Sequence, residues 1–127
     1  MRASAIAASL FALTTAGSAS AADNGRFAVH GAGALECAKY VYYFDNGDSS
    51  DEAKDKATQM LTWAEGYVTR FNRATEKTYD IFGSLNNRDM ATWLYIYCKS
   101  NLGTDFSEAV DAMTISMWTT RTEKSPK

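Results

Sequence analysis

The most regular pattern of hydrophobic and polar positions runs from Asp51 to Asn72. Apolar residues recur there at intervals of three and four, which places them on one face of an α-helix, and the charged residues fall mainly off that face. This face consists of Ala53, Ala57, Met60, Leu61, Ala64, Val68 and Phe71. Ser49 and Glu52 have the spacing of a capping box, in which each side chain accepts a hydrogen bond from the other residue's backbone N–H. The pattern predicts a long amphipathic helix, and the close approach of another helix is one reason to keep Gly66 inside it.

A second helix is predicted before the long one, over residues 34–44, because Leu35, Ala38 and Val41 follow the helical period. Tyr42 extends the same face. The aromatic run at 40–44 is also rich in residues that favour strands, so a strand is the alternative for this segment. The Asp, Asn and Gly residues that follow predict a turn that ends the element.

Two further helices are predicted after residue 85. Asn86 or Asn87 can cap the first of them, with Asp89 in its first turn. Its apolar face consists of Met90, Leu94, Tyr97 and Cys98, although 93–97 could also be read as a buried strand. The second begins with a capping box headed by Asp105. Its apolar stripe consists of Phe106, Ala109, Val110, Met113 and Met117.

The first 21 residues are typical of a secretory signal peptide. Arg2 is followed by an uncharged, mostly apolar run and then by small residues up to Ala21. This is the order of a positive start, an apolar middle and a small-residue cleavage site. The apolar run is shorter than the roughly 20 residues that a transmembrane helix needs. We therefore expect export to the periplasm, with secretion as the alternative, and no membrane anchor.

The rest of the 127 residues is too short for two ordinary domains. Residues 22–33 contain three glycines and predict a flexible N-terminal arm in which His30 is exposed. Residues 34–118 predict one helical, disulfide-bonded domain. Residues 119–127 are polar and hold the only proline, which predicts a flexible tail.

Cys37 and Cys98 are the only cysteines of the chain. An even number of cysteines in an exported protein favours a disulfide, and two cysteines allow one intramolecular pairing. For a bridge that closes the long loop between Cys37 and Cys98, the chain-entropy relation gives about 4 kcal/mol of stabilisation. A redox-active pair is the alternative, but such pairs typically have the Cys-x-x-Cys spacing that lowers a thiol pKa. We expect a structural bridge within an all-α bundle of about four helices.

Charge and composition exclude several kinds of chemistry. A net charge of −2 gives no general attraction to nucleic acid or to an anionic membrane. One histidine and two cysteines are too few for a typical Cys/His zinc site. The turn from Asp45 to Asp48 lacks the ligand spacing of a calcium loop. His30 stands in the predicted arm, away from any Ser/His/Asp set. We therefore expect a binding protein rather than an enzyme, with no cofactor and no metal.

Aromatic residues are the candidates for binding, since they make up 13% of the chain. Tyr and Trp supply contact area at a low entropy cost and are enriched where proteins bind each other. The candidate protein-binding residues are Tyr40, Tyr43, Trp63, Tyr67, Trp93 and Tyr95. The alternative is that most of them are half-buried around the disulfide.

Three short fragments occur in an order that is known from one family. They are Glu36–Tyr40, Trp63–Tyr67 and Tyr97–Asn101. The order Cys, then Trp-x-x-Gly-aromatic, then Tyr-Cys-x-x-Asn resembles the HdeA/HdeB family of acid-stress chaperones. The resemblance implies a helical periplasmic protein with one disulfide, which forms a dimer that opens at low pH and shields unfolding client proteins.

A second family is similar in size and in its use of a disulfide. These are the Tai-type immunity proteins, which neutralise amidases of type VI secretion systems in the periplasm. The helix around Gly66 and Tyr67 is the part of this chain that looks like theirs. This resemblance implies a toxin as the partner. The expected partners are therefore other proteins, either unfolding clients or a toxin, with a homodimer as a further option.

Overall fold

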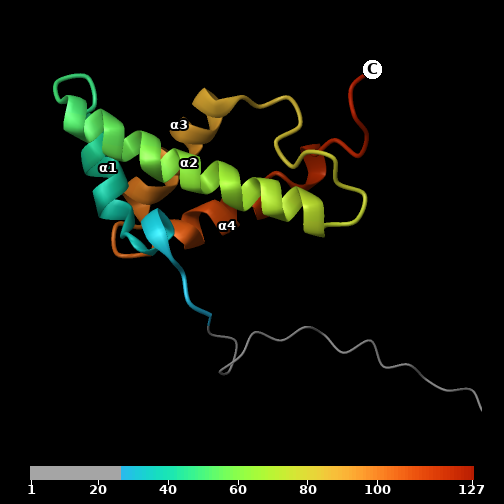
Figure 1. Cartoon of the computed structure of the whole chain (residues 1–127), viewed down its shortest axis with the longest axis horizontal. Coiled ribbons are helices and arrows are strands. Elements are labelled where there is room, and N and C mark those ends of the chain that lie inside the picture. Colours follow the sequence, from blue (N-terminus) through green and yellow to red (C-terminus); the bar gives the residue numbers. More distant parts are fainter. Residues whose placement is uncertain (1–26) are drawn as a thin grey trace, which may run out of the picture.

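Four α-helices carry the fold (Figure 1). They are α1 (Cys37–Asn46), α2 (Asp51–Ala74), α3 (Asn87–Ser100) and α4 (Phe106–Ser116), with short 3-10 helices η1 (Gly31–Ala34) and η2 (Trp118–Thr120). These bounds come from a computed structural model that describes residues 27–127, so the predicted signal peptide lies outside the described residues. The described part contains no strand beyond two isolated bridges. The prediction of a small all-α bundle is confirmed.

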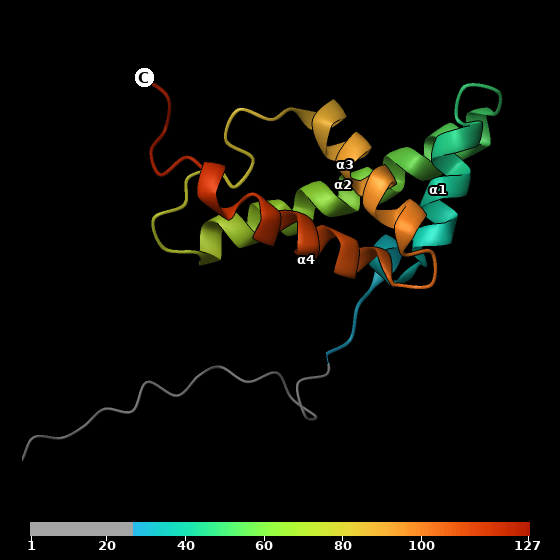
Figure 2. The same cartoon turned by 180° about the vertical axis from the view of Figure 1, so that it is seen from behind.

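The long helix α2 runs along one side of the molecule, with α1 and α4 packed against it, whereas α3 packs mainly on α1 and α4 (Figure 1). Seen from behind, α4 runs along much of α2, while α3 lies beside α1 (Figure 2). The segment between α2 and α3 and the C-terminal segment meet at the far end of α2 (Figures 1 and 2).

The core lies between the four helices and follows their apolar stripes. Its largest fully buried hydrophobic side chains are Tyr40, Phe106, Met60, Ile81, Met90, Leu94, Met113 and Val110. The predicted inner faces of α2, α3 and α4 are therefore largely correct. Gly66 is exposed, and a Cβ there would meet no atom within 4 Å. It does not mark the close approach of another helix.

The first helix differs from its prediction in both its start and its inner face. It begins at Cys37, and the buried positions are Cys37 and Tyr40. Leu35 is 39% exposed and Tyr42 is 60% exposed, although the pattern placed both inside. The reason is that the disulfide fixes which side of this short helix points inward, and a ten-residue helix holds too few apolar positions to define a face.

The disulfide prediction is confirmed. Cys37 at the start of α1 is bonded to Cys98 near the end of α3, and both side chains are fully buried. Backbone hydrogen bonds support the same junction. Cys37 N donates to Thr104 O over 2.8 Å, and Phe106 N donates to Leu35 O over 2.7 Å. The start of α1 is thus held to α3 by a covalent bond and to the start of α4 by the backbone.

Helix caps agree with the sequence in one case and differ in two. At α3, the Asn86 side chain accepts from Asp89 N over 3.1 Å, and the Asp89 carboxylate accepts from Asn86 N over 3.0 Å. At α2 the cap is Ser50, which accepts from Ala53 N over 3.2 Å, so the predicted cap was one residue early. Asp105 occupies the N-cap position of α4 without a side-chain hydrogen bond.

Both ends of the described chain contain more structure than the predicted arm and tail. Residues 31–34 form η1 against α2, and Gly33 is buried. In the C-terminal segment, Tyr79 N donates to Thr122 O over 2.8 Å, and Thr122 N donates to Asp80 O over 2.9 Å. The tail thereby packs on the segment that precedes α3 up to Thr122.

Candidate functional site

The six predicted binding aromatics occupy three different environments. Tyr40 is fully buried, and its hydroxyl donates to Ala91 O over 3.0 Å. It is therefore a core residue, and its assignment to a binding surface is wrong. Tyr40 lies one helical turn from the disulfide-bonded Cys37, which fixes this side of α1 against the core.

Tyr43 on α1 and Tyr95 on α3 are both half-buried and pack against the core. Tyr95 stacks on Phe44 with ring centroids 4.3 Å apart, and its hydroxyl donates to the Asp45 carboxylate over 2.6 Å. The Lys99 ammonium lies 5.2 Å from the centroid of the Tyr95 ring. These contacts join two helices, so Tyr95 is largely engaged within the fold.

The other three predicted aromatics, Trp63, Tyr67 and Trp93, each stack on another ring of their own helix. Trp63 and Tyr67, one turn apart on α2, stack with centroids 5.9 Å apart. Trp93 stacks on Tyr97 of α3 with centroids 5.4 Å apart and an interplanar angle of 12°. Trp63, Tyr67 and Tyr97 then line a common groove.

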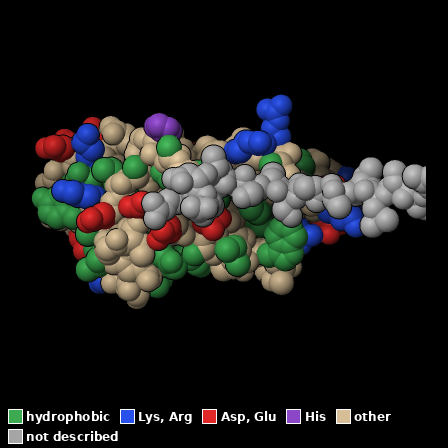
Figure 3. Space-filling model, turned by 90° about the horizontal axis from the view of Figure 1, so that it is seen from below, with side chains coloured by type: hydrophobic (Ala, Val, Ile, Leu, Met, Phe, Trp, Pro, Cys, Tyr) green, Lys and Arg blue, Asp and Glu red, His purple; other side chains and the backbone are tan. Residues whose placement is uncertain are grey.

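This groove, which we call the α4 groove, has a volume of about 710 Å³, within the range of about 300–1,000 Å³ that is typical of ligand sites. It brings together one face of α4, two rings from α2, one ring from α3 and the start of the described chain. Its lining residues are Phe27, Ala28, Val29, His30, Trp63, Tyr67, Tyr97, Ser107, Glu108, Asp111, Ala112 and Ile115. In Figure 3, which shows the molecule from below, acidic side chains gather among hydrophobic ones on the face from which the chain enters the fold.

Trp63 is held at the groove by two contacts. Its indole Nε1 donates to His30 O over 2.9 Å. Its ring also lies directly against Gly33, where a Cβ would come within 2.1 Å of the ring carbon Cζ2. Glycine at 33 thus allows η1 to pack flat on the indole, and both contacts fix the ring that forms one wall of the groove.

Tyr67 connects α2 to α4 across the groove. Its hydroxyl donates to Asp111 Oδ1 over 2.8 Å. The pKa of the Tyr67 phenol is raised from 10.0 to about 12, mainly by partial burial and also by the hydrogen bond to the negatively charged Asp111. The phenol is therefore a neutral donor throughout the physiological pH range.

Sequence reasoning missed the α4 side of the groove. Glu108, Asp111, Ala112 and Ile115 are spaced at i, i+3, i+4 and i+7, which makes them one outward face of the helix. Ile115 is 69% exposed on that face. This mixed stripe of acids and apolar residues was the signal in the sequence, but the inward stripe of the same helix was the stronger pattern.

A second, smaller depression of about 330 Å³ lies beside the C-terminal half of α2. Its polar groups are largely engaged with one another. Asn72 Oδ1 accepts from Ile81 N over 2.9 Å, Asn72 Nδ2 donates to Asp80 Oδ1 over 3.3 Å, and Asn87 Nδ2 donates to Glu65. Tyr79 at its edge is 51% exposed. We interpret this depression as part of the junction between α2 and the segment that leads into α3.

Other site chemistry is sparse in the part of the chain that the structure describes. Residues 27–127 contain no group of three or more His, Cys, Asp or Glu side chains that could hold a metal ion. None of the helices among these residues has the length and apolar character that a membrane span requires.

Comparison with models of protein families, with curated proteins and with solved structures found no match to this chain.

Proposed function

We propose that the chain is an exported, non-enzymatic protein-binding domain that acts as an acid-responsive chaperone, in the way that its resemblance to the HdeA/HdeB family implies. One observation carries the acid response. In residues 27–127, every side-chain-to-side-chain hydrogen bond that joins two α-helices is accepted by a carboxylate. These bonds run from Tyr95 to Asp45 over 2.6 Å, from Asn87 to Glu65 over 2.6 Å and from Tyr67 to Asp111 over 2.8 Å.

Protonation weakens these three connections. A hydrogen bond to an ionised carboxylate is roughly twice as strong as one between neutral groups, and this advantage is lost when the acceptor is protonated. Full protonation also removes the 15 negative charges of Asp and Glu. It leaves the Lys and Arg residues, which are 13 in the whole chain and 12 without Arg2 of the predicted signal peptide, to repel one another. Acid therefore weakens contacts between α1, α2, α3 and α4, and it also weakens the bond by which the Asp89 carboxylate caps α3.

Opening of the helices would enlarge an apolar surface that is already present. The α4 groove displays the rings of Trp63, Tyr67 and Tyr97 at neutral pH. Separation of α2 from α4 would add the buried side chains beneath them. The Cys37–Cys98 bond keeps α1 joined to α3, which limits how far the domain can unfold. An exposed apolar surface of this kind is what a chaperone needs to cover an unfolding client.

The experiment is to measure light scattering from an acid-unfolding client protein at about pH 2 to 3, below the ordinary range of carboxyl titration, with and without the oxidised protein. We expect the protein to suppress aggregation there, and to have little effect at neutral pH. If a molar excess leaves client aggregation at low pH unchanged, the chaperone proposal is wrong.

Two triple variants separate the three bridging carboxylates from general charge. The test variant carries Asp45→Asn, Glu65→Gln and Asp111→Asn. The control carries Asp48→Asn, Asp55→Asn and Glu76→Gln, which are exposed acids. Both remove three charges, but the test variant also replaces the three carboxylate acceptors. We expect the test variant to bind a hydrophobic dye at a higher pH than the control, and identical dye-binding curves would contradict this mechanism.

An immunity protein that neutralises a periplasmic toxin is the second candidate. The observation that favours it is that the groove is already formed and that a disulfide ties the bundle together, since a surface that is already shaped loses little entropy on binding. Affinity capture from periplasm at neutral pH distinguishes the two functions. One stoichiometric partner at neutral pH favours the immunity protein, whereas many unrelated partners that bind only in acid favour the chaperone.

A further inference from the structure

The charges that line the α4 groove are of one sign. Glu108 and Asp111, one turn apart on α4, both line it and are exposed. Among residues 27–127, no Lys or Arg lines it, and His30 contributes the one ionisable nitrogen. The one ion pair within residues 27–127 is between Arg121 and Glu123. The two groove carboxylates therefore have no basic partner among the described residues.

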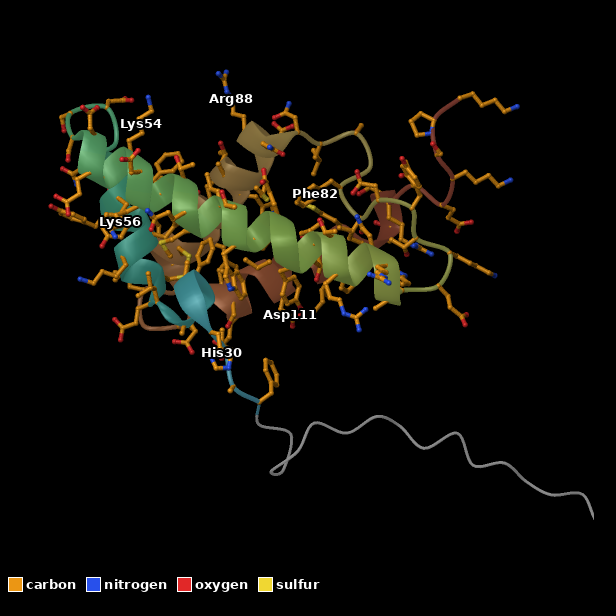
Figure 4. All side chains as sticks on the ribbon, in the orientation of Figure 1. His30, Lys54, Lys56, Phe82, Arg88 and Asp111 are labelled. Atoms are coloured by element: carbon orange, nitrogen blue, oxygen red, sulfur yellow. A yellow bond between two sulfur atoms is a disulfide. The ribbon has the colours of Figure 1, made fainter. Side chains whose placement is uncertain are left out.

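Three basic side chains that Figure 4 labels lie away from this site. In Figure 4, the labelled Asp111 and His30 lie on the lower side of the molecule, where the described chain begins. The labelled Lys54, Lys56 and Arg88 lie well apart from Asp111, toward the other end of α2 or on the upper side. Intramolecular neutralisation by these three cations would need large movements, and no other basic side chain of residues 27–127 forms an ion pair with Glu108 or Asp111. The two carboxylates are therefore open to a cation from outside.

Aromatic and aliphatic surface adjoins the two carboxylates. The ring of Tyr67, held by its bond to Asp111, lies beside Trp63 on one side of α4, and Tyr97 contributes from α3. Ile115 is 69% exposed one turn beyond Asp111. Such rings attract cations through their faces and large apolar side chains through their area. The groove thus offers two kinds of contact within one or two helical turns.

We propose that at neutral pH the α4 groove binds a segment of another protein in which a Lys or Arg adjoins a large apolar side chain. The basic group lies against Glu108 and Asp111, and the apolar side chain lies against Trp63, Tyr67 and Ile115. This inference rests on the groove being a protein-binding surface, but it does not need the acid response.

A second copy of this chain is a poorer occupant than a basic segment. In a two-fold symmetric contact the same surface faces itself. Groove against groove would bring Glu108 and Asp111 close to their counterparts, and His30 is the one basic side chain among the described lining residues. Like charges opposed in this way weaken a contact, whereas a basic segment from a different protein supplies the missing charge.

The test uses two fluorescent peptides with the same leucine and phenylalanine residues, one carrying two lysines and the other two glutamates. Fluorescence anisotropy at neutral pH and low salt measures their affinity for the oxidised protein. We expect the lysine peptide to bind and the glutamate peptide to bind at least about tenfold more weakly, with the difference shrinking as salt is added. Equal binding of the two peptides, or binding of neither, would overturn the proposal.

Two matched pairs of substitutions test whether the lysine peptide binds at the α4 groove. Glu108→Gln with Asp111→Asn keeps size and leaves an oxygen acceptor for Tyr67. Asp55→Asn with Glu76→Gln removes the same charge from exposed positions outside the groove. We expect the first pair to weaken the lysine peptide about three- to tenfold, as two exposed ion pairs allow, and the second pair to leave its affinity unchanged. Equal losses of affinity in both variants would show that the peptide responds to general charge attraction, and would contradict binding at the groove.

A third variant and one pH series complete the test. Ile115→Ser changes an exposed residue and is expected to weaken the lysine peptide while leaving the circular dichroism spectrum unchanged. The groups facing the bound cation that can titrate are Glu108, Asp111, His30, Tyr67 and Tyr97. Acid is therefore expected to release the peptide.

The two proposals can fail separately. If the protein fails the client assay but passes these peptide tests, the groove proposal stands and the chaperone proposal is wrong. If it passes the client assay but fails the peptide tests, only the groove proposal is refuted. Self-association that the peptide cannot displace would assign the groove to a second copy and overturn the proposal.

Discussion

The Tyr67 hydroxyl on α2 donates a hydrogen bond to Asp111 Oδ1 on α4 over 2.8 Å, and this pair forms one edge of the α4 groove. Because the donor is a phenol and the acceptor is a carboxylate, the contact is weakened when Asp111 gains a proton and lost when Tyr67 gives up its proton. Acid removes the charge of the acceptor, and strong alkali removes the proton of the donor. This contact at the edge of the groove is therefore strongest at pH values between these two extremes.

Alkaline pH tests the environment of Tyr67. Its pKa in the folded protein is raised to about 12 from an ordinary value of 10.0, mainly by burial and further by Asp111. A raised pKa means that the stability associated with this phenol is fully present below pH 10.0 and is lost as pH rises toward about 12. Burial also raises the pKa of Tyr40, in the same direction. We expect the urea midpoint to fall across this range.

Tyr67→Phe gives the matching measurement. This variant removes one ionisable phenol and its bond to Asp111, so we expect it to be slightly less stable at neutral pH and to lose less stability above pH 10.0 than the wild type does. Absorbance of tyrosinate at high pH follows the same ionisation directly. Parallel stability curves for the two proteins would show that Tyr67 is not the responsible group.

Gly33 and Gly66 are predicted to respond in opposite directions to alanine. A Cβ at Gly33 would come within 2.1 Å of the Trp63 ring, whereas a Cβ at Gly66 would meet nothing within 4 Å. Gly33→Ala therefore has to displace the indole, which lowers stability and exposes Trp63 to water. Gly66→Ala removes a glycine from the interior of a helix and is expected to raise the free energy of unfolding by about 0.5–1 kcal/mol. Thermal unfolding and the tryptophan emission maximum measure both effects, and a tolerated Gly33→Ala would contradict the packing described for η1.

Cys37 and Cys98 are expected to stabilise the domain by restricting the unfolded chain. They are 61 residues apart in sequence, and a loop of that length corresponds to about 4 kcal/mol in the chain-entropy relation. Replacing both with serine is therefore expected to lower the free energy of unfolding by about 2–4 kcal/mol. Urea titration of the oxidised protein, the reduced protein and the double serine variant checks this. An unchanged midpoint in the reduced protein would contradict a structural role.

Helix periodicity predicted the fold well where apolar stripes were long. The stripes of α2, α3 and α4 each cover several turns, so their inner faces followed from the sequence, and the two cysteines indicated which helices lie together. Tyr40 shows the limit of this reasoning. Its short helix has aromatic residues on several sides, and only the disulfide beside it determines that Tyr40 points inward and Tyr42 outward.

The candidate site was less predictable because it depends on segments that are distant in sequence. Trp63 and Tyr67 were identified, but the acids that lie against them come from α4, more than forty residues later. The contact between His30 O and Trp63 likewise joins residues that no local pattern connects. Local spacing identifies a helix face, whereas a groove between faces requires the crossing of the helices to be known.

Two helix starts provide a final prediction, in which similar sequence patterns are expected to differ in energy. Asn86 and Asp105 both precede a helix and have an acidic residue three positions later. At Asn86 both hydrogen bonds of the capping box are made. At Asp105 the side chain makes none, because this residue pairs through its backbone with Glu36 at the start of α1, and the following Phe106 N donates to Leu35 O.

Asn86→Ala is therefore expected to lower stability by about 1 kcal/mol, the usual cost of a lost N-cap. Asp105→Ala is expected to cost less, because it removes only the attraction between a negative charge and the helix N-terminus, about 0.3–1 kcal/mol and reduced by salt. Urea titrations at low and high salt separate the two effects: the loss in Asn86→Ala is expected to persist in salt, and the loss in Asp105→Ala to fade. A larger, salt-independent loss at Asp105 would mean that its carboxylate caps α4 in solution.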